Sequence, residues 1–168
     1  MVYCAYIIIL NIMSTKDHAK VKTIPPLIPL TFIILAWVIN KYVFALPIPL
    51  SLGTQTIIAY VMMPIAAILF AFSLYFFIKT KQNPEPHTPT NALYTGGVFR
   101  ITRNPIYLGF LIAQIVVAIK LNNLYVILSL PIVWWLLNKW VIEPEETYLE
   151  KLFGQEYLDY KKKVRRWL

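Results

Sequence analysis

A stretch without a single charged residue runs from position 56 to position 78 and restricts what this chain can fold into. An α-helix needs roughly 20 apolar residues to cross the hydrocarbon core of a bilayer, and this stretch is long enough. Pro64 lies inside it and is expected to kink the helix, which membrane helices tolerate. Soluble domains usually carry about 25% charged residues, whereas this chain carries 14% and is 58% hydrophobic. We therefore predict an all-α integral membrane protein.

Three further apolar segments occupy positions 27–46, 106–121 and 124–142. Lys41 is the only charge in the first, close enough to its end to reach the interface. Asn122 and Asn123 separate the last two by a brief polar turn, which predicts a closely packed helical hairpin. We expect about four transmembrane helices. The predicted organisation is an N-terminal segment 1–26, two spans in 27–78, a cytosolic loop 79–104, and the hairpin with a cofactor-binding tail in 105–168.

The basic residues predict the orientation of these helices. They gather in three regions, 16–22, 79–103 and 139–166, and contribute to a net charge of +8. With four spans these regions fall on one side, which the positive-inside rule makes cytoplasmic. Both termini are then cytoplasmic. Because the basic residues flank apolar segments, we expect anionic membrane lipid and no nucleic acid as their partner.

The two ends of the chain carry separate expectations. Met13 is followed at once by polar residues, so one hypothesis is that it is the natural start. Near the other end, Gly154 suits a helix C-terminus. Tyr157, Tyr160 and Val164 then share one face of a cytosolic amphipathic helix. This helix would lie on the membrane surface or pack over the mouth of the hairpin.

A metal site is not expected. Cys4 is the only cysteine, and His18 and His87 are far apart in polar surroundings. A protein metal site needs several ligands with supporting groups around them.

Two polar segments should meet at one membrane surface, because one precedes the third apolar segment and the other follows the fourth. This places Arg100 and Arg103 near the glutamates Glu143, Glu145 and Glu146. An arginine beside the free backbone N–H groups of a helix start suits a ligand carboxylate. The same groups could also merely pair across the hairpin or extend to the interface.

The runs TGGVFRITRNPIYLG, PEE and LFGQEYLDYKKKVRRW resemble the isoprenylcysteine carboxyl methyltransferase and phospholipid methyltransferase superfamily. The resemblance covers about position 84 to the C-terminus. It implies an S-adenosylmethionine site at the cytosolic membrane face. The implied cofactor-site residues are Gly97, Arg103, Asn104, Pro105, Tyr107, Gly109, Glu145 and Glu146. No catalytic residue is assigned, although Arg103 and Glu146 are candidates.

Asn104 departs from the histidine of the eukaryotic enzymes and resembles bacterial members, which implies a bacterial inner membrane. Asparagine can form hydrogen bonds but does not titrate near pH 7. Cofactor binding is therefore a better-supported expectation than specificity for prenylcysteine. The absence of a catalytic triad is compatible with methyl transfer, because the sulfonium already activates the methyl group.

The leading interpretation is an S-adenosylmethionine-dependent methyltransferase whose lipid-like or prenylated acceptor arrives through the bilayer. Two alternatives stay open: a membrane sterol-type reductase that uses NADPH, and a four-helix membrane scaffold without catalysis. The sequence identifies neither the acceptor, nor the oligomeric state, nor whether oxygen or nitrogen is methylated.

Overall fold

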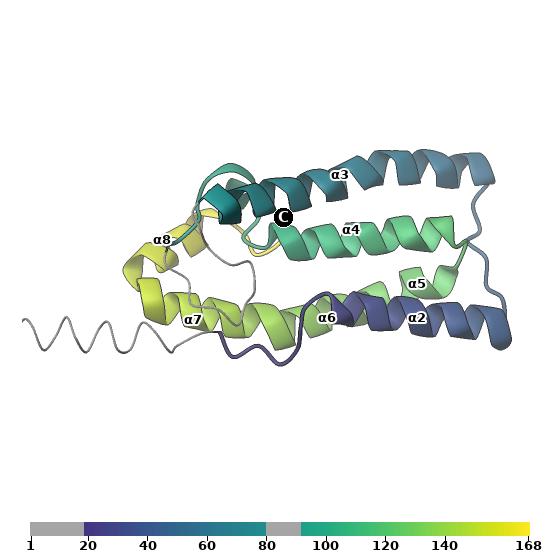
Figure 1. Cartoon of the computed structure of the whole chain (residues 1–168), viewed down its shortest axis with the longest axis horizontal. Coiled ribbons are helices and arrows are strands. Elements are labelled where there is room, and N and C mark those ends of the chain that lie inside the picture. The colour runs from purple at the N-terminus through teal and green to yellow at the C-terminus, as the bar shows by residue number, and fades with distance from the viewer. Residues whose placement is uncertain (1–18, 80–91) are drawn as a thin grey trace, which may run out of the picture.

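The computed structural model describes residues 19–79 and 92–168, and every regular element within those ranges is a helix (Figure 1). The predictions about Met13, Cys4, His18 and His87 lie outside the described residues. In chain order the main helices are α2 (Leu27–Tyr42), α3 (Leu52–Lys79), α4 (Pro105–Lys120), α5 (Leu124–Leu128), α6 (Leu130–Leu137), α7 (Glu143–Phe153) and α8 (Gln155–Lys163). A 3₁₀ helix, η1 (Gly97–Arg100), precedes α4, and a π-helix, η2 (Asn138–Ile142), joins α6 to α7.

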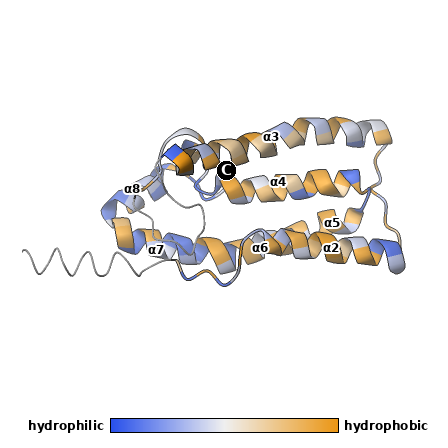
Figure 2. Ribbon diagram, viewed as in Figure 1, coloured by the Kyte–Doolittle hydropathy of each residue, from blue (hydrophilic) through white to orange (hydrophobic). Residues whose placement is uncertain are grey.

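Helix α4 lies at the centre of the bundle. Helix α3 packs along one side of it, while α2, α5 and α6 pack on the other (Figure 1). The turn between α4 and α5 joins the two arms of the predicted hairpin. The first arm is α4, and the second begins with α5 and continues through α6. Apolar side chains dominate the length of these helices, and hydrophilic residues concentrate in α7 and α8 (Figure 2).

One face of α3 follows a period that the sequence analysis did not detect. Its inward residues recur in alternating steps of four and three, the spacing of left-handed helix packing. They are Gln55, Ala59, Met62, Ala66, Leu69, Ser73 and Phe76. Several of these are small, which lets α3 approach α4 closely. Most of the other large apolar side chains of α3 that the structure describes are exposed, among them Ile57, Val61 and Ile68, as expected for a helix that faces lipid.

The helices of the second arm form one continuous helical stretch from Leu124 to Phe153. Within it, Pro144 at the start of α7 removes one backbone hydrogen bond. Proline has no N–H to offer the carbonyl four residues earlier. That carbonyl belongs to Trp140, within η2, and it accepts instead from the backbone N–H of Lys22 at 3.0 Å. The segment before α2 is thereby attached to the π-helix, and Ala19 and Val21 are buried beside Val141 and Ile142.

Two described helical stretches are long and apolar enough to cross a membrane, Leu52–Phe76 and Leu124–Phe153. Helices α2 and α4 have 16 residues each. At 1.5 Å per residue they extend about 24 Å, less than the roughly 30 Å of hydrocarbon. The helix expected over 27–46 ends early, at Tyr42. Pro47 disfavours helical backbone at Leu46, and the backbone N–H of Leu46 donates instead to Asn40 Oδ1 at 2.8 Å.

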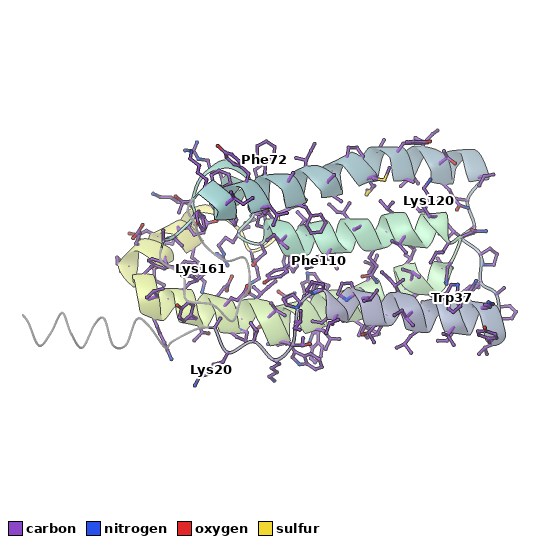
Figure 3. The ribbon with its side chains drawn as sticks, in the orientation of Figure 1. Lys20, Trp37, Phe72, Phe110, Lys120 and Lys161 are labelled. Atoms are coloured by element: carbon purple, nitrogen blue, oxygen red, sulfur yellow. The ribbon has the colours of Figure 1, made fainter. Side chains whose placement is uncertain are left out.

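Polar side chains fasten the end of the bundle where Trp37 and Lys120 lie (Figure 3). Asn122 accepts from the backbone N–H of Ile48 at 3.0 Å and from Gln55 Nε2 at 3.3 Å. Asn123 caps α5 and donates to the Ala36 carbonyl at 3.0 Å. The predicted Asn-Asn turn therefore binds α2, α3 and the connection between them.

The tail, from Gly154 to the C-terminus, was predicted either to lie on the membrane surface or to pack over the mouth of the hairpin. Gly154 ends α7 with a φ of +52°, a conformation that favours glycine. Helix α8 then turns back, and Tyr157, Tyr160 and Val164 are buried against Val98 and Phe99. The tail therefore packs over the mouth of the hairpin, and the C-terminus lies beside the start of α4 (Figure 1).

Candidate functional site

Arg103 and Glu146 form an ion pair where the start of α4 meets the start of α7. Arg103 Nη2 lies 2.7 Å from Glu146 Oε1, and the two side chains are only 8% and 7% exposed. The predicted meeting of the two polar segments is therefore observed for this pair. A buried arginine and glutamate with this geometry form a charge-assisted hydrogen bond, stronger than one between neutral groups.

Glu146 has a second arginine partner that the sequence analysis did not predict. Arg166 Nη2 lies 2.6 Å from Oε2 of Glu146, and Arg166 Nε lies 3.2 Å from Oε1. This hydrogen bonding to the carboxylate raises the pKa of the Arg166 guanidinium above its ordinary value. One carboxylate thus holds two guanidinium groups.

The tail also occupies most of the donors of Arg103. Its Nη1 donates to the carbonyls of Lys161 and Val164, both at 3.1 Å, and its backbone N–H donates to the Arg165 carbonyl at 3.0 Å. Its Nε is buried and, within the described residues, has no hydrogen-bond partner. Such a donor is costly to bury unpaired, so it is available for an acceptor supplied by a ligand.

Asn104 and Pro105 begin α4, as the sequence indicated. Asn104 Nδ2 donates to the Arg166 carbonyl at 2.9 Å, and Thr102 Oγ1 donates to the same carbonyl at 3.1 Å. Pro105 takes the first helical position, where its missing N–H costs nothing. The Asn104 amide therefore anchors the tail.

Tyr107 and Glu145 form a second pair beside the first. The Tyr107 hydroxyl donates to Glu145 Oε1 at 2.5 Å, and the tyrosine is buried. Because Glu145 and Glu146 are consecutive, one contacts Tyr107 and the other contacts the two arginines. Both pairs connect α4 to α7.

The two candidate glycines lie against rings of α3. Gly97 has a φ of +57°, and an added Cβ would overlap the Phe76 ring, with Cζ at 2.6 Å. A Cβ on Gly109 would lie 3.2 Å from Phe70 Cζ. Phe76 also contacts Tyr94 in a tilted arrangement and Phe99 edge to face, at centroid distances of 6.4 and 6.0 Å. These two glycines permit close packing of α4 and η1 on α3.

Arg100 and Glu143 were expected beside Arg103 and Glu146, but neither belongs to the cluster of buried pairs. Glu143 pairs with Lys139 at 2.9 Å on the exposed side of the helix, and its nearest cluster contact is Arg166 Nη1 at 3.9 Å. Arg100 is exposed on η1, and it forms no ion pair among the residues that the structure describes. The sequence could not separate these residues from Arg103 because all of them lie close to a helix end.

Three further members of the cluster went unpredicted: Thr102, Asn138 and Arg166. Thr102 and Asn138 carried no signal of their own, since hydroxyl and amide side chains at helix ends are common. Arg166 belongs to the tail motif, but its contacts depend on how α8 turns back. Within 19–79 and 92–168, no group of three or more residues could hold a metal ion.

A family model described as phospholipid methyltransferase matches residues 43–156. An uncharacterized protein of Haemophilus influenzae is 44% identical over 62 residues, which are 37% of this chain and 98% of that protein. Protein-S-isoprenylcysteine O-methyltransferase B of Arabidopsis thaliana is 32% identical over 111 residues, or 66% of this chain and 54% of the enzyme. The Schizosaccharomyces pombe protein-S-isoprenylcysteine O-methyltransferase is 32% identical over 87 residues, which are 52% of this chain and 35% of that enzyme.

The chain thus spans about half, or less, of the length of the two named methyltransferases. No solved structure matches it significantly. The family match covers most of the described helices, including both arms of the hairpin and the start of α8. The resemblance seen in the three sequence runs is confirmed, and the chain belongs to the phospholipid methyltransferase family.

Proposed function

We propose that this protein is an integral membrane methyltransferase that uses S-adenosylmethionine and acts on a lipid-like or prenylated acceptor. The observation that carries the proposal is the 2.7 Å contact between Arg103 and Glu146, with Tyr107 and Glu145 paired beside it. These four side chains come from distant parts of the chain and meet at one end of an apolar bundle. Membership of the phospholipid methyltransferase family supports the same chemistry.

The proposal includes four membrane spans with both termini in the cytosol. The end of the bundle that carries α7 and α8 is hydrophilic and includes Lys161 (Figures 2 and 3). Lysine and arginine are enriched on the cytoplasmic side of membrane proteins. Because α2 and α4 are short, we expect them to cross where the bilayer thins locally or where Lys41 and Lys120 reach the far interface.

The residues at this end have the donors and acceptors that S-adenosylmethionine requires. Arg103 Nε is a buried donor without a partner in the described part of the chain, and it suits the carboxylate of the ligand. Glu145 can accept from ribose hydroxyls or from the ligand amine through the oxygen that Tyr107 does not hold. The rings near Gly97 would suit adenine. The cofactor, when bound, supplies a methyl group that its sulfonium already activates.

The protein's own part in the reaction is orientation and the exclusion of water. A carboxylate acceptor would need no base, whereas an amine acceptor would need to lose a proton first. A lipophilic acceptor fits the surroundings, because large apolar side chains of α2, α3 and α6 are exposed along the bundle, among them Trp134 and Trp135. The Arabidopsis and yeast relatives are named for an isoprenylcysteine acceptor, which supports a prenylated substrate.

Isothermal titration of the full chain in detergent with S-adenosylmethionine tests cofactor binding. We expect binding by the wild type and at least about tenfold weaker binding by Arg103→Ala and Glu146→Ala, since each loses a charge-assisted contact. Arg100→Ala is the matched control, because Arg100 is exposed, and it should bind like the wild type. A folded wild type that binds NADPH instead would favour the reductase, and one that binds neither would favour the scaffold.

Transfer of a tritiated methyl group in native membranes tests the reaction itself. Label should move into the lipid fraction or into membrane protein, and base-labile label would indicate an ester. Membranes that contain the wild type and show no more transfer than membranes with Glu146→Ala would contradict a methyltransferase function.

A further inference from the structure

Arg166 lies in the C-terminal segment 164–167 and contacts three other parts of the chain. Its side chain binds both carboxylate oxygens of Glu146, at 2.6 and 3.2 Å. Its backbone carbonyl accepts from Thr102 and Asn104, at 3.1 and 2.9 Å. One residue therefore holds the start of α7 with its side chain and the start of α4 with its main chain.

Asn138 holds the tail through hydrogen bonds from its side-chain amide. Its Oδ1 accepts from Trp167 Nε1 at 3.2 Å and from Arg166 Nη1 at 3.4 Å, and its Nδ2 donates to the Trp134 carbonyl at 2.8 Å. Asn138 is buried at the first position of the π-helix. π-Helices are frequent at functional sites, and here the π-helix presents an amide to Arg166 and Trp167 of the tail.

The neighbouring Arg165 carries the same charge as Arg166 but lacks its side-chain contacts, so comparing the two distinguishes the effect of the contacts from the effect of the charge. Its backbone carbonyl accepts from Arg103, but its side chain is exposed. Arg166 and Arg165 carry the same charge at adjacent positions, and only Arg166 contacts Glu146. A variant at each position removes one positive charge, so a difference between them reports the contacts.

We propose that Arg166 is a positioning residue of the cofactor site, which holds Glu146 and the start of α4 so that Arg103 and Glu146 are oriented for the cofactor. This inference rests on the proposed function. Arg166 acts through Glu146 and Asn104 and does not itself contact the reacting atoms. Groups that fix the side chains around a site in this way contribute to affinity, because a bound geometry within about 0.5 Å must be maintained.

The test compares Arg166→Gln, Arg166→Lys and Arg165→Gln in the full chain, by isothermal titration with S-adenosylmethionine in detergent. We expect Arg166→Gln to bind about ten- to one-hundred-fold more weakly than the wild type, the loss of one charge-assisted contact. Arg165→Gln should bind within about twofold of the wild type. Arg166→Lys keeps the charge but offers one donor atom in place of the guanidinium fork, so its affinity should fall between the two.

Equal affinities of Arg166→Gln and Arg165→Gln would overturn the inference, since charge alone would then account for the effect. Tighter binding by Arg166→Gln would also overturn it, because Arg166 would then obstruct the site. If Arg166→Gln does not fold, Arg166→Lys carries the test: it keeps the charge and removes the guanidinium fork, and an affinity equal to that of the wild type would refute the role. A wild type that binds no cofactor refutes the proposed function as well, whereas binding by the wild type with no difference among the variants refutes only this inference.

Discussion

Arg103 and Glu146 lie 43 positions apart in the chain, yet Nη2 of the arginine is 2.7 Å from Oε1 of the glutamate. Both side chains are shielded from solvent. Their contact connects the two arms of the helical hairpin at the end where the tail returns. Because the ion pair is buried, removal of Glu146 leaves the Arg103 charge without its carboxylate partner, whereas Glu146 would keep Arg166 if Arg103 were removed.

We predict that Glu146→Leu lowers the free energy of unfolding by about 3–5 kcal/mol, the usual cost of leaving a buried charge without its partner. The measurement is denaturant or thermal unfolding in detergent. The control is Lys139→Leu, which breaks the exposed pair between Lys139 and Glu143 and should cost less than about 1 kcal/mol. Similar losses in the two variants would mean that the buried pair has no special weight.

The Tyr107–Glu145 hydrogen bond gives a prediction about binding. Tyr107→Phe keeps the ring and removes the hydroxyl, so Glu145 loses a donor and becomes freer to rotate. We expect weaker S-adenosylmethionine binding, by about three- to tenfold, from the loss of one hydrogen bond of about 1 kcal/mol. Tyr75→Phe, on the exposed face of α3, should leave the affinity unchanged. Equal affinities in both variants would remove Tyr107 from the site.

Gly109 should behave as a packing residue. A Cβ at this position would approach the Phe70 ring to 3.2 Å, and the ring can yield by a few tenths of an ångström. We predict that Gly109→Ala costs about 1 kcal/mol of stability and Gly109→Leu about 3 kcal/mol or more, as overpacking does. Phe70→Ala should partly restore Gly109→Leu.

The cofactor affinity of Gly109→Ala, measured below its unfolding midpoint, decides between the two roles. Affinity like that of the wild type supports a packing role, because the nearest atoms to an added Cβ belong to α3. A tenfold loss of affinity in a folded Gly109→Ala would instead place this glycine beside the cofactor, as the family resemblance implies.

The sequence predicted the helices of the hairpin and the pairing of their ends because apolar length and polar turns are local signals. The same reasoning extended the first helix to position 46, since Val43, Phe44 and Leu46 are apolar and hydrophobicity does not mark where a helix ends. The packed face of α3 was missed for the opposite reason. Every residue of that helix before Lys79 is uncharged, so hydrophobicity alone cannot show which side faces α4.

The sequence predicted only the part of the candidate site in which the hairpin brings oppositely charged residues together. Arg103 and Glu146 follow from the antiparallel hairpin, but Arg166 could be placed only after α8 was known to turn back at Gly154. Asn104 shows the limit of a motif: its position was predicted, whereas its amide binds the tail carbonyl of Arg166. A motif identifies a residue and does not specify the partner of each of its atoms.

Asn123 gives a prediction for the opposite end of the bundle. Its Oδ1 caps α5 through the backbone N–H of Tyr125, and its Nδ2 donates to the Ala36 carbonyl, both at 3.0 Å. Asn123→Ala should lower the free energy of unfolding by about 2 kcal/mol, the sum of a lost cap and one lost buried hydrogen bond. Cofactor affinity should not change, because Asn123 lies at the end remote from Arg103. A loss of affinity without a loss of stability would show that the two ends are coupled.

Tyr160 makes the docking of the tail dependent on pH. Its hydroxyl donates to the Phe99 carbonyl at 2.6 Å, and burial raises its pKa from 10.0 to about 12. The folded chain therefore favours the neutral phenol. The resulting stabilisation is complete below pH 10 and is lost as the pH rises from 10 towards 12.

We therefore expect the packing of α8 on η1 to loosen between pH 10 and pH 12. Fluorescence of a label on α8, introduced as Lys162→Cys in a Cys4→Ser background, would report the change. Tyr160→Phe removes the titrating group and the hydrogen bond together, so its signal should be less dependent on pH over this interval, although its tail is held less firmly at neutral pH. If Tyr160→Phe and the parent lose the signal at the same pH, another group controls the docking. The buried Tyr157, whose pKa burial also raises, is the next to test with the same substitution.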